Sequence, residues 1–142
     1  MISTLSQLVM QSESNNNRAA VRFEPAFKPS DLAVQRCAKI NQCNLATARV
    51  LCAMSFGAYQ MMGENIYNLL GYGCTISEYL NSDAIQDASF IAHNDAKGIG
   101  DITLYDVLTN VDKRFLFARK YNGNGQAYGD WLLTNYRLHG GA

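Results

Sequence analysis

Apolar side chains recur every three or four residues along most of the chain, which is the spacing of amphipathic helices. The first stripe consists of Leu5, Leu8 and Val9, and Thr4 precedes it as a side chain able to cap the helix. Three asparagines at 15–17 are expected to end this helix, because short amide side chains compete for backbone hydrogen bonds. The pattern therefore predicts an N-terminal helix of about ten residues.

The same periodicity predicts helices along the rest of the chain, at about 31–40 behind the cap Ser30, at 44–54 behind Asn44, and at 64–70, 76–81, 83–97, 103–109, 111–120 and 126–138. Residues 23–29 hold both prolines and are predicted to be a connector. Residues 56–63 are bounded by Gly57 and Gly63 and are predicted to form a turn or an irregular segment. No internal repeat and no long alternating run is present. The expected class is all-α, or α+β with a minimal β element.

A chain of 142 residues fits one domain, 1–142, and is long enough to build its own core. Its 48% hydrophobic and 17% charged residues exclude intrinsic disorder. No apolar run approaches the roughly 20 residues of a membrane span. Twelve basic residues balance twelve acidic ones, so the net charge gives no reason to expect nucleic acid as a partner.

Processing and metal-binding signals are weak. No Lys or Arg precedes Arg18, and Gln7 interrupts the first apolar pattern, so we expect synthesis in a cytoplasm without a signal peptide. The cysteines, at 37, 43, 52 and 74, have no Cys-x-x-Cys spacing and are expected to be reduced thiols, some of them in the core. With His93 and His139 as the two histidines, we expect no metal site and no cofactor.

Glu13 is the first candidate for chemistry. It lies four residues after Val9 and eight after Leu5, so it continues the apolar stripe of the first helix. A carboxyl at the edge of an apolar face is partly desolvated, which raises its pKa and suits it to general acid catalysis. The alternative is a glutamate at a helix end that points into water.

Two later segments combine groups that bind sugars. The segment 55–60 (Ser-Phe-Gly-Ala-Tyr-Gln) offers a small hydroxyl, a close backbone approach and an amide, with Ser55, Tyr59 and Gln60 as candidate binding residues. The segment 120–131 interleaves aromatic rings with Asn, Gln and Gly, and Tyr121, Asn122 and Tyr128 are its candidates. The alternatives are a plain helix-to-turn junction for the first segment and a loop that packs its own aromatics for the second.

Taken together, these segments resemble the goose-type lysozyme and soluble lytic transglycosylase superfamily, and most closely the N-acetylmuramidase catalytic domain of phage endolysins. The resemblance spans about residues 5–138. Its motifs are Glu13-Ser14, Phe23-Glu24-Pro25, Ser55-x-Gly57-x-x-Gln60 running into Met62-Gly63, and Phe117-Ala118-x-x-Tyr121-Asn122-Gly123. The chain departs from the family at 15–17, where asparagines replace glycines, and at Ala26, where a histidine is common.

The resemblance implies a lysozyme-like fold and cleavage of the bond between N-acetylmuramic acid and N-acetylglucosamine, with Glu13 as the acid. Glu24 is the candidate second carboxylate, or alternatively an ion-pair partner for Arg22 or Lys28. Ser55, Gln60, Tyr121 and Asn122 would hold the sugar or orient Glu13.

The implied partner is bacterial peptidoglycan, and the implied site of action is the cell wall. We expect a monomer that is phage-encoded and is released through a holin-like pore or delivered in a virion. Two alternatives remain at this stage: a lytic transglycosylase that forms 1,6-anhydro products, and a non-catalytic wall-binding or virion protein.

Overall fold

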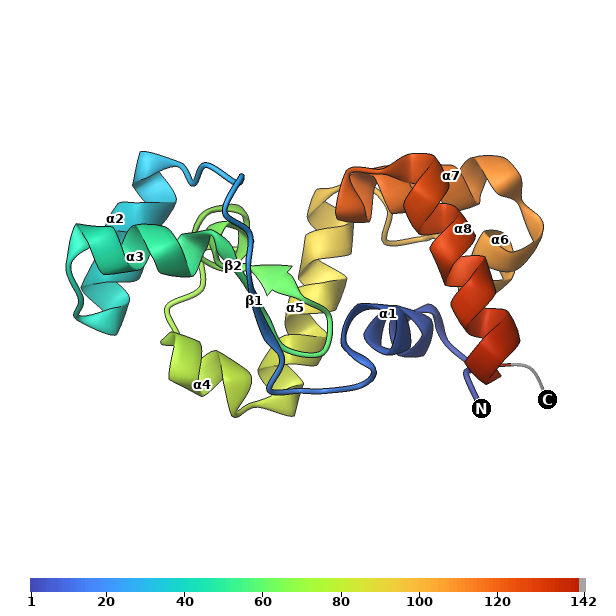
Figure 1. Ribbon diagram of the computed structural model, residues 1–142, viewed down its shortest axis with the longest axis horizontal. Coiled ribbons are helices and arrows are strands. Elements are labelled where there is room, and N and C mark those ends of the chain that lie inside the picture. Colours follow the sequence, from blue (N-terminus) through green and yellow to red (C-terminus); the bar gives the residue numbers. More distant parts are fainter. Residues whose placement is uncertain (141–142) are drawn as a thin grey trace. The chain divides into compact units, whose positions relative to one another are not determined.

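The computed structural model describes residues 1–140 and is mostly helical, with one small three-stranded sheet (Figure 1). This architecture confirms the predicted all-α class with a minimal β element. The chain divides into two compact units. The terminal unit comprises residues 1–16 and 94–140 of the described chain, and the middle unit comprises residues 17–93.

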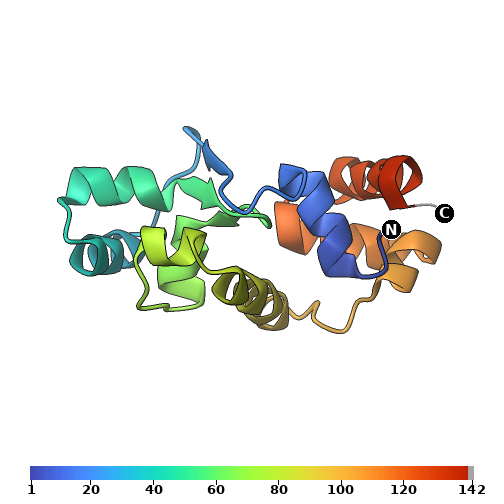
Figure 2. The ribbon, with the colours of Figure 1, turned by 90° about the horizontal axis from the view of Figure 1, so that it is seen from below.

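The terminal unit joins the first helix to the last ones. Its helices are α1 (Leu5–Ser14), α6 (Leu104–Thr109), α7 (Val111–Asn122), α8 (Gly125–Asn135) and the π-helical turn η2 (Tyr136–Gly140). Helices α7 and α8 pack together, and α1 packs against α8 (Figure 2). Leu5, Leu8 and Val9 are buried, as the apolar stripe predicted. They share the interior of this unit with Phe117 and Leu132.

The middle unit holds the sheet and its surrounding helices (Figure 1). Its elements are β1 (Val21–Phe23), α2 (Asp31–Asn41), α3 (Leu45–Cys52), β2 (Met54–Phe56), β3 (Met61–Met62), η1 (Asn65–Leu69), α4 (Ile76–Leu80) and the start of α5 (Asp83–Ala96). The strands are antiparallel in the order β1-β2-β3, with Arg22 opposite Ser55 and Ser55 opposite Met62. Helices α2 and α3 pack side by side over a core that includes Phe56 and Tyr67.

Several helix starts follow the predicted capping chemistry. Thr4 forms a capping box with Gln7: the Thr4 hydroxyl accepts from the Gln7 N–H, and the Gln7 side chain accepts from the Thr4 N–H. Ser30 and Asn44 cap α2 and α3 through their side-chain oxygens. Helix α1 ends at Asn15, which adopts the left-handed conformation with φ 54°. Local side-chain chemistry therefore sets these boundaries.

The predicted connector is confirmed at residues 24–29 and the predicted turn at 57–60, and the correction concerns the flanking residues: Phe23 ends β1, Phe56 ends β2, and Met61–Met62 form β3. The strands are two or three residues long, too short for alternation to reveal them in the sequence. The predicted helix at 44–54 also ends earlier, at Cys52, because Met54 pairs with Phe23 in the sheet. Pairing between distant segments overrides the local pattern here.

Cys37 and Cys52 are free thiols buried in the core of the middle unit, as predicted for some of the cysteines, while Cys43 and Cys74 are partly buried. Within residues 1–140, no group of three His, Cys, Asp or Glu side chains is arranged to hold a metal ion. Over the same residues, no helix combines the length and apolar character that crossing a membrane requires.

Gly63 is a glycine because the chain approaches another backbone closely at this point. A Cβ atom added here would collide with the carbonyl oxygen of Leu51 and lie 2.9 Å from Cα of Cys52. Both neighbours are backbone atoms of α3, so neither can move without shifting the helix. This contact gives the Met62-Gly63 motif a physical reason.

We expect Gly63→Ala to lower the free energy of unfolding by about 2–3 kcal/mol, because the added methyl group overpacks a rigid contact. The matched control is Gly73→Ala, since a Cβ atom at Gly73 meets nothing within 4 Å. Its effect should be neutral or slightly stabilising, because alanine restricts the unfolded chain. Urea unfolding of both variants checks this, and equal midpoints would contradict the close approach.

Candidate functional site

Glu13 lies in the last turn of α1 and is partly buried. Helix α8 packs against this end of α1, where the Trp131 indole N–H donates to the carbonyl oxygen of Ser12 at 3.3 Å. Trp131 is itself 48% exposed. Glu13 therefore directly follows Ser12, whose backbone carbonyl group is hydrogen-bonded to α8.

Aromatic rings from α7 and α8 form a row within the terminal unit. Phe117 and Tyr121 stack with ring centroids 5.4 Å apart, and Tyr121 and Tyr128 follow with centroids 6.2 Å apart. Phe117 is fully buried, Tyr128 is 7% exposed and Tyr121 is partly buried. Tyr128 precedes Trp131 by three residues on α8, so both project from one side of that helix.

The row reaches Glu13 through Tyr128. Burial is the main cause that raises the pKa of Tyr128 well above its ordinary value, and the negative charge of the nearby Glu13 carboxylate adds to it, as does Tyr121. Three predicted site residues, Glu13, Tyr121 and Tyr128, are therefore close together. Asn122 is exposed at the end of α7, where Gly123 adopts a φ of 91° and terminates the helix.

Glu24 belongs to the middle unit and forms an ion pair. The Nε of Arg22 donates to its Oε1 at 2.7 Å, and the Glu24 N–H donates to the carbonyl oxygen of Ala53 at 2.9 Å. Arg22 is therefore the residue that forms the ion pair with Glu24, of the two ion-pair partners considered from the sequence. The role of Glu24 as a second carboxylate stays a prediction.

Ser55 and Gln60 close the turn of the β2–β3 hairpin in the middle unit. The Ser55 hydroxyl donates to Oε1 of Gln60 at 2.7 Å, and Nε2 of Gln60 donates to the carbonyl oxygen of Gly57 at 3.0 Å. Gln60 has a φ of 52°, in the left-handed region, and Ser55 is 2% exposed. Both side chains thus have intramolecular partners that fix the shape of the turn, and their sugar-binding role stays a prediction.

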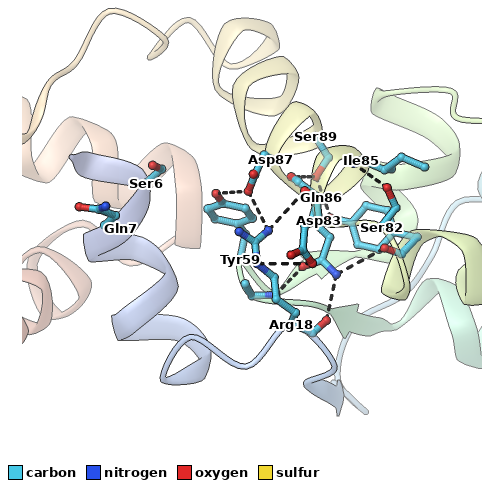
Figure 3. A network of polar contacts seen from close by, with 12 residues as sticks. Ser6, Gln7, Arg18, Tyr59, Ser82, Asp83, Ile85, Gln86, Asp87 and Ser89 are labelled. Atoms are coloured by element: carbon cyan, nitrogen blue, oxygen red, sulfur yellow. Dashed lines mark hydrogen bonds and ion pairs between the residues drawn. The ribbon is translucent and has the colours of Figure 1, made fainter. Parts of the chain in front are cut away.

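Tyr59 lies in the same turn and is held by α5 (Figure 3). Its ring stacks on Phe90 at 4.6 Å between centroids, and its hydroxyl donates to Oδ1 of Asp87 at 2.7 Å. Arg18 donates to the same carboxylate oxygen at 2.7 Å and lies over the Tyr59 ring at 5.7 Å from its centroid. Tyr59 is therefore part of a partly buried polar network.

Gln86 is the centre of that network (Figure 3). Its Oε1 accepts from the N–H of Ala58 at 2.9 Å, and its Nε2 donates to the carbonyl oxygen of Arg18 at 2.9 Å. Gly57 has a φ of 80°, and a Cβ atom there would collide with the Gln86 amide. One fully buried side chain thus joins α5 to the hairpin turn and to the segment after Asn17.

Sequence reasoning missed Arg18, Gln86 and Asp87 as organising residues. A signal was present, since Gln86, Ser89 and His93 occupy the same face of α5 as Phe90, and all four are buried. Polar side chains on the buried face of a helix require hydrogen-bond partners. Their partners lie far along the chain, so the pattern alone does not identify them.

Comparison with known proteins found a curated relative. The chain is 28% identical to a protein named endolysin from Enterobacteria phage PRD1, over 145 aligned positions that cover 96% of this chain and 97% of the relative. No protein-family model matches the chain. No solved structure matches it either.

The Asp87 network predicts a pH-dependent contribution to stability. Burial opposes ionisation of Asp87, but hydrogen bonds from Arg18 and Tyr59 outweigh it and hold the pKa of Asp87 below its ordinary value. A lowered folded-state pKa stabilises the fold above the unfolded-state value of about 3.9, and this contribution is lost as the pH falls through the folded-state pKa.

Asp87→Asn should therefore reduce the free energy of unfolding near pH 7 by about 0.5–1 kcal/mol, a small effect because the ion pair is partly exposed. The difference from wild type should shrink below about pH 4, as the wild-type carboxylate is protonated. Denaturant unfolding at several pH values measures it. Asp101→Asn, on an exposed residue, serves as the control, and a constant difference at all pH values would contradict the charge-based explanation.

Proposed function

We propose that this protein is an endolysin that degrades bacterial peptidoglycan, and that it does so as an N-acetylmuramidase with Glu13 as its general acid. The observation that carries the proposal is the similarity to the PRD1 endolysin, which extends over almost the full length of both chains. Similarity confined to one short segment would be much weaker support for a shared function. The proposed enzyme needs no cofactor and acts on the cell wall as a monomer.

The surroundings of Glu13 support the role of general acid. The residue is partly buried near Tyr128, which is the last ring of the row Phe117–Tyr121–Tyr128. A carboxyl group with restricted access to water keeps its proton more readily than one in bulk solvent. This is the property that protonation of a glycosidic oxygen requires.

The proposed reaction breaks the bond between C1 of N-acetylmuramic acid and O4 of N-acetylglucosamine. Glu13 gives its proton to O4, which leaves as a hydroxyl group while positive charge develops at C1 and the ring oxygen. A water oxygen then bonds to C1, and the proton that water loses passes to a carboxylate. In the inverting version of this chemistry Glu24 takes that proton.

A second outcome, lytic transglycosylation, is favoured by one observation: the Glu24 carboxylate is already engaged by Arg22 at 2.7 Å. Without another free base, the oxygen of the 6-hydroxyl of the N-acetylmuramic acid itself can bond to C1 and pass its proton to the carboxylate that Glu13 has become, which gives a 1,6-anhydro product. Both routes use Glu13 as the acid in the first step and differ in the second step.

The remaining predicted residues are proposed to bind the glycan. Tyr121 and the exposed Asn122 offer a ring and an amide beside the chain's candidate acid. Ser55, Tyr59 and Gln60 are proposed to act through the hairpin turn, whose shape their internal hydrogen bonds maintain. A protein that binds the cell wall without cleaving it would need the same surface but not the Glu13 proton.

Replacement of the acid tests the proposal directly. We expect wild-type protein to clear a suspension of purified cell walls, and Glu13→Gln to do so at least about a hundredfold more slowly, because the amide cannot donate a carboxylic proton. Turbidity measures the rate and circular dichroism checks the fold. The control is Glu78→Gln, since Glu78 is exposed and glutamine can also complete the capping box of α4. Equal clearing by Glu13→Gln and wild type would remove Glu13 from the mechanism.

The products identify the second step. We expect mass spectrometry of digested peptidoglycan to find reducing N-acetylmuramic acid ends, and we expect Glu24→Gln to lose this hydrolysis because the base is gone. Anhydro ends from wild type, together with full activity of Glu24→Gln, would assign transglycosylation and leave Glu24 as the ion-pair partner of Arg22.

A further inference from the structure

Trp131 is the one tryptophan of the chain, and it combines a fixed position with an exposed ring. Its indole N–H donates to the carbonyl oxygen of Ser12 at 3.3 Å, while 48% of the residue stays exposed. It ends the segment 120–131, in which aromatic rings alternate with amides and glycines. The reaction proposed above gives this residue no role.

The fold explains the indole N–H but not the ring. The carbonyl groups in the last turn of a helix have no partner within the helix, and Ser12 lies in the last turn of α1. The N–H groups of Asn15 and Asn16 donate to carbonyl oxygens of earlier residues, so Trp131 supplies a donor for the Ser12 oxygen. A glutamine side chain would supply one equally well. Helix capping alone therefore does not account for a tryptophan.

The exposed part of the ring is a prepared binding surface. It remains in water and so adds no hydrophobic stabilisation to the fold. Because the hydrogen bond to Ser12 restricts the orientation of the indole, a ligand that covers the ring immobilises little that was free before. Tryptophan offers a large flat contact area at a low cost in side-chain entropy. These are the properties of an anchor for a ligand with an apolar face.

The position of the ring indicates which ligand it binds. Ser12 directly precedes Glu13, so the indole is anchored to the turn of α1 that carries the candidate acid. The residues that end this helix are rich in amides: Nε2 of Gln11 donates to Oδ1 of Asn15 at 2.6 Å, and Nδ2 of Asn16 donates to Oε1 of Gln11 at 2.7 Å. An aromatic surface combined with a few polar groups is typical of sites for small polar ligands such as sugars.

We propose that Trp131 is a substrate-binding residue: the exposed face of its indole stacks on a pyranose ring of the glycan, next to the linkage that Glu13 protonates. This inference rests on the proposed function, since it names a group that holds the substrate of the same reaction. The C–H bonds of a β-1,4-linked amino sugar form an apolar face on the ring. The electron-rich face of the indole attracts these slightly positive hydrogens.

A membrane surface is the other ligand that an exposed tryptophan commonly binds. A tryptophan at a bilayer interface places its ring against the acyl chains and keeps its polar end among the headgroups. In this protein the indole N–H is already used by Ser12. Asp130 and Thr134, the exposed neighbours of Trp131 on α8, are polar, and Asp130 has the same charge sign as anionic lipids. The surroundings of the ring therefore favour a glycan.

Tryptophan fluorescence tests the contact directly, because Trp131 is its single source in this chain. The Glu13→Gln variant, which leaves the ligand intact, is titrated with soluble uncross-linked strands of alternating N-acetylglucosamine and N-acetylmuramic acid. We expect a saturable change in emission, and an acrylamide quenching constant that falls about twofold or more at saturation, because the sugar covers the exposed ring. Calorimetry of the same samples measures binding independently.

Two variants separate the ring from its N–H group. Trp131→Gln removes the ring and keeps an N–H donor for the Ser12 oxygen, so we expect KM for the strands to rise about tenfold, with kcat changed less. Trp131→Phe keeps a flat ring and loses the donor, so KM should stay within about threefold of wild type while the urea midpoint of unfolding falls. A purely structural role of Trp131 would give the opposite order of KM values.

The matched control is Tyr105→Gln, which removes an aromatic ring that is 74% exposed on α6 of the same unit. Its KM should equal that of wild type. This result shows that a higher KM in Trp131→Gln reflects the place of the ring and not the general loss of an exposed aromatic side chain.

Three results would overturn the proposal. The first is glycan binding by calorimetry with unchanged emission and quenching of Trp131. The second is an equal KM for Trp131→Gln and wild type. The third is an emission change with vesicles of anionic phospholipid and none with glycan, which would assign the ring to a membrane surface.

The proposed function and the role of Trp131 fail separately. Wild type that leaves cell walls intact, while glycan still protects Trp131 from acrylamide, would overturn the muramidase reaction and leave the glycan contact standing. Wild type that cleaves the walls, with no effect of bound glycan on Trp131, would do the reverse. Absence of both cleavage and binding would overturn both.

Discussion

The burial of one side of α1 against α8 is the contact on which the candidate site depends. Leu5, Leu8 and Val9 remove the apolar face of α1 from water, and the same face ends at Glu13. A carboxyl group that continues a buried stripe cannot be fully solvated. The hydrophobic packing of the terminal unit thus sets the surroundings of its candidate acid, and the bond from Trp131 to Ser12 fixes the end of the helix that carries it.

The middle unit is organised by polar contacts instead. Gln86 satisfies backbone groups from two other segments, and Asp87 receives hydrogen bonds from Arg18 and Tyr59. A fully buried polar side chain such as Gln86 needs hydrogen-bond partners, so it favours one arrangement of the segments that it joins. These contacts explain why the turn at 57–60 accepts a glycine at φ 80° and Gln60 at φ 52°. Hydrogen bonds from Ser55, Gln60 and Gln86 hold the turn in this conformation.

Much of the fold was predictable from local chemistry. Thr4, Ser30 and Asn44 cap helices as expected, because a capping bond spans only three residues and is visible in a short stretch of sequence. The three strands were not predictable. Each is too short to show an alternating pattern of apolar and polar residues, and each is stabilised by pairing with another strand. For the candidate site, the spacing of Glu13 along α1 predicted its partial burial. The aromatic row beside it required the pairing of α7 with α8.

The sequence by itself determined the helical class, the helix that carries Glu13 and the side of that helix on which the residue lies, since each depends on periodicity and capping within one segment. Only the tertiary structure decided that Tyr128 is buried near Glu13, and that Ser55, Tyr59 and Gln60 have partners within their own unit. Such contacts join residues far apart along the chain, and their geometry is set by packing that no local pattern records.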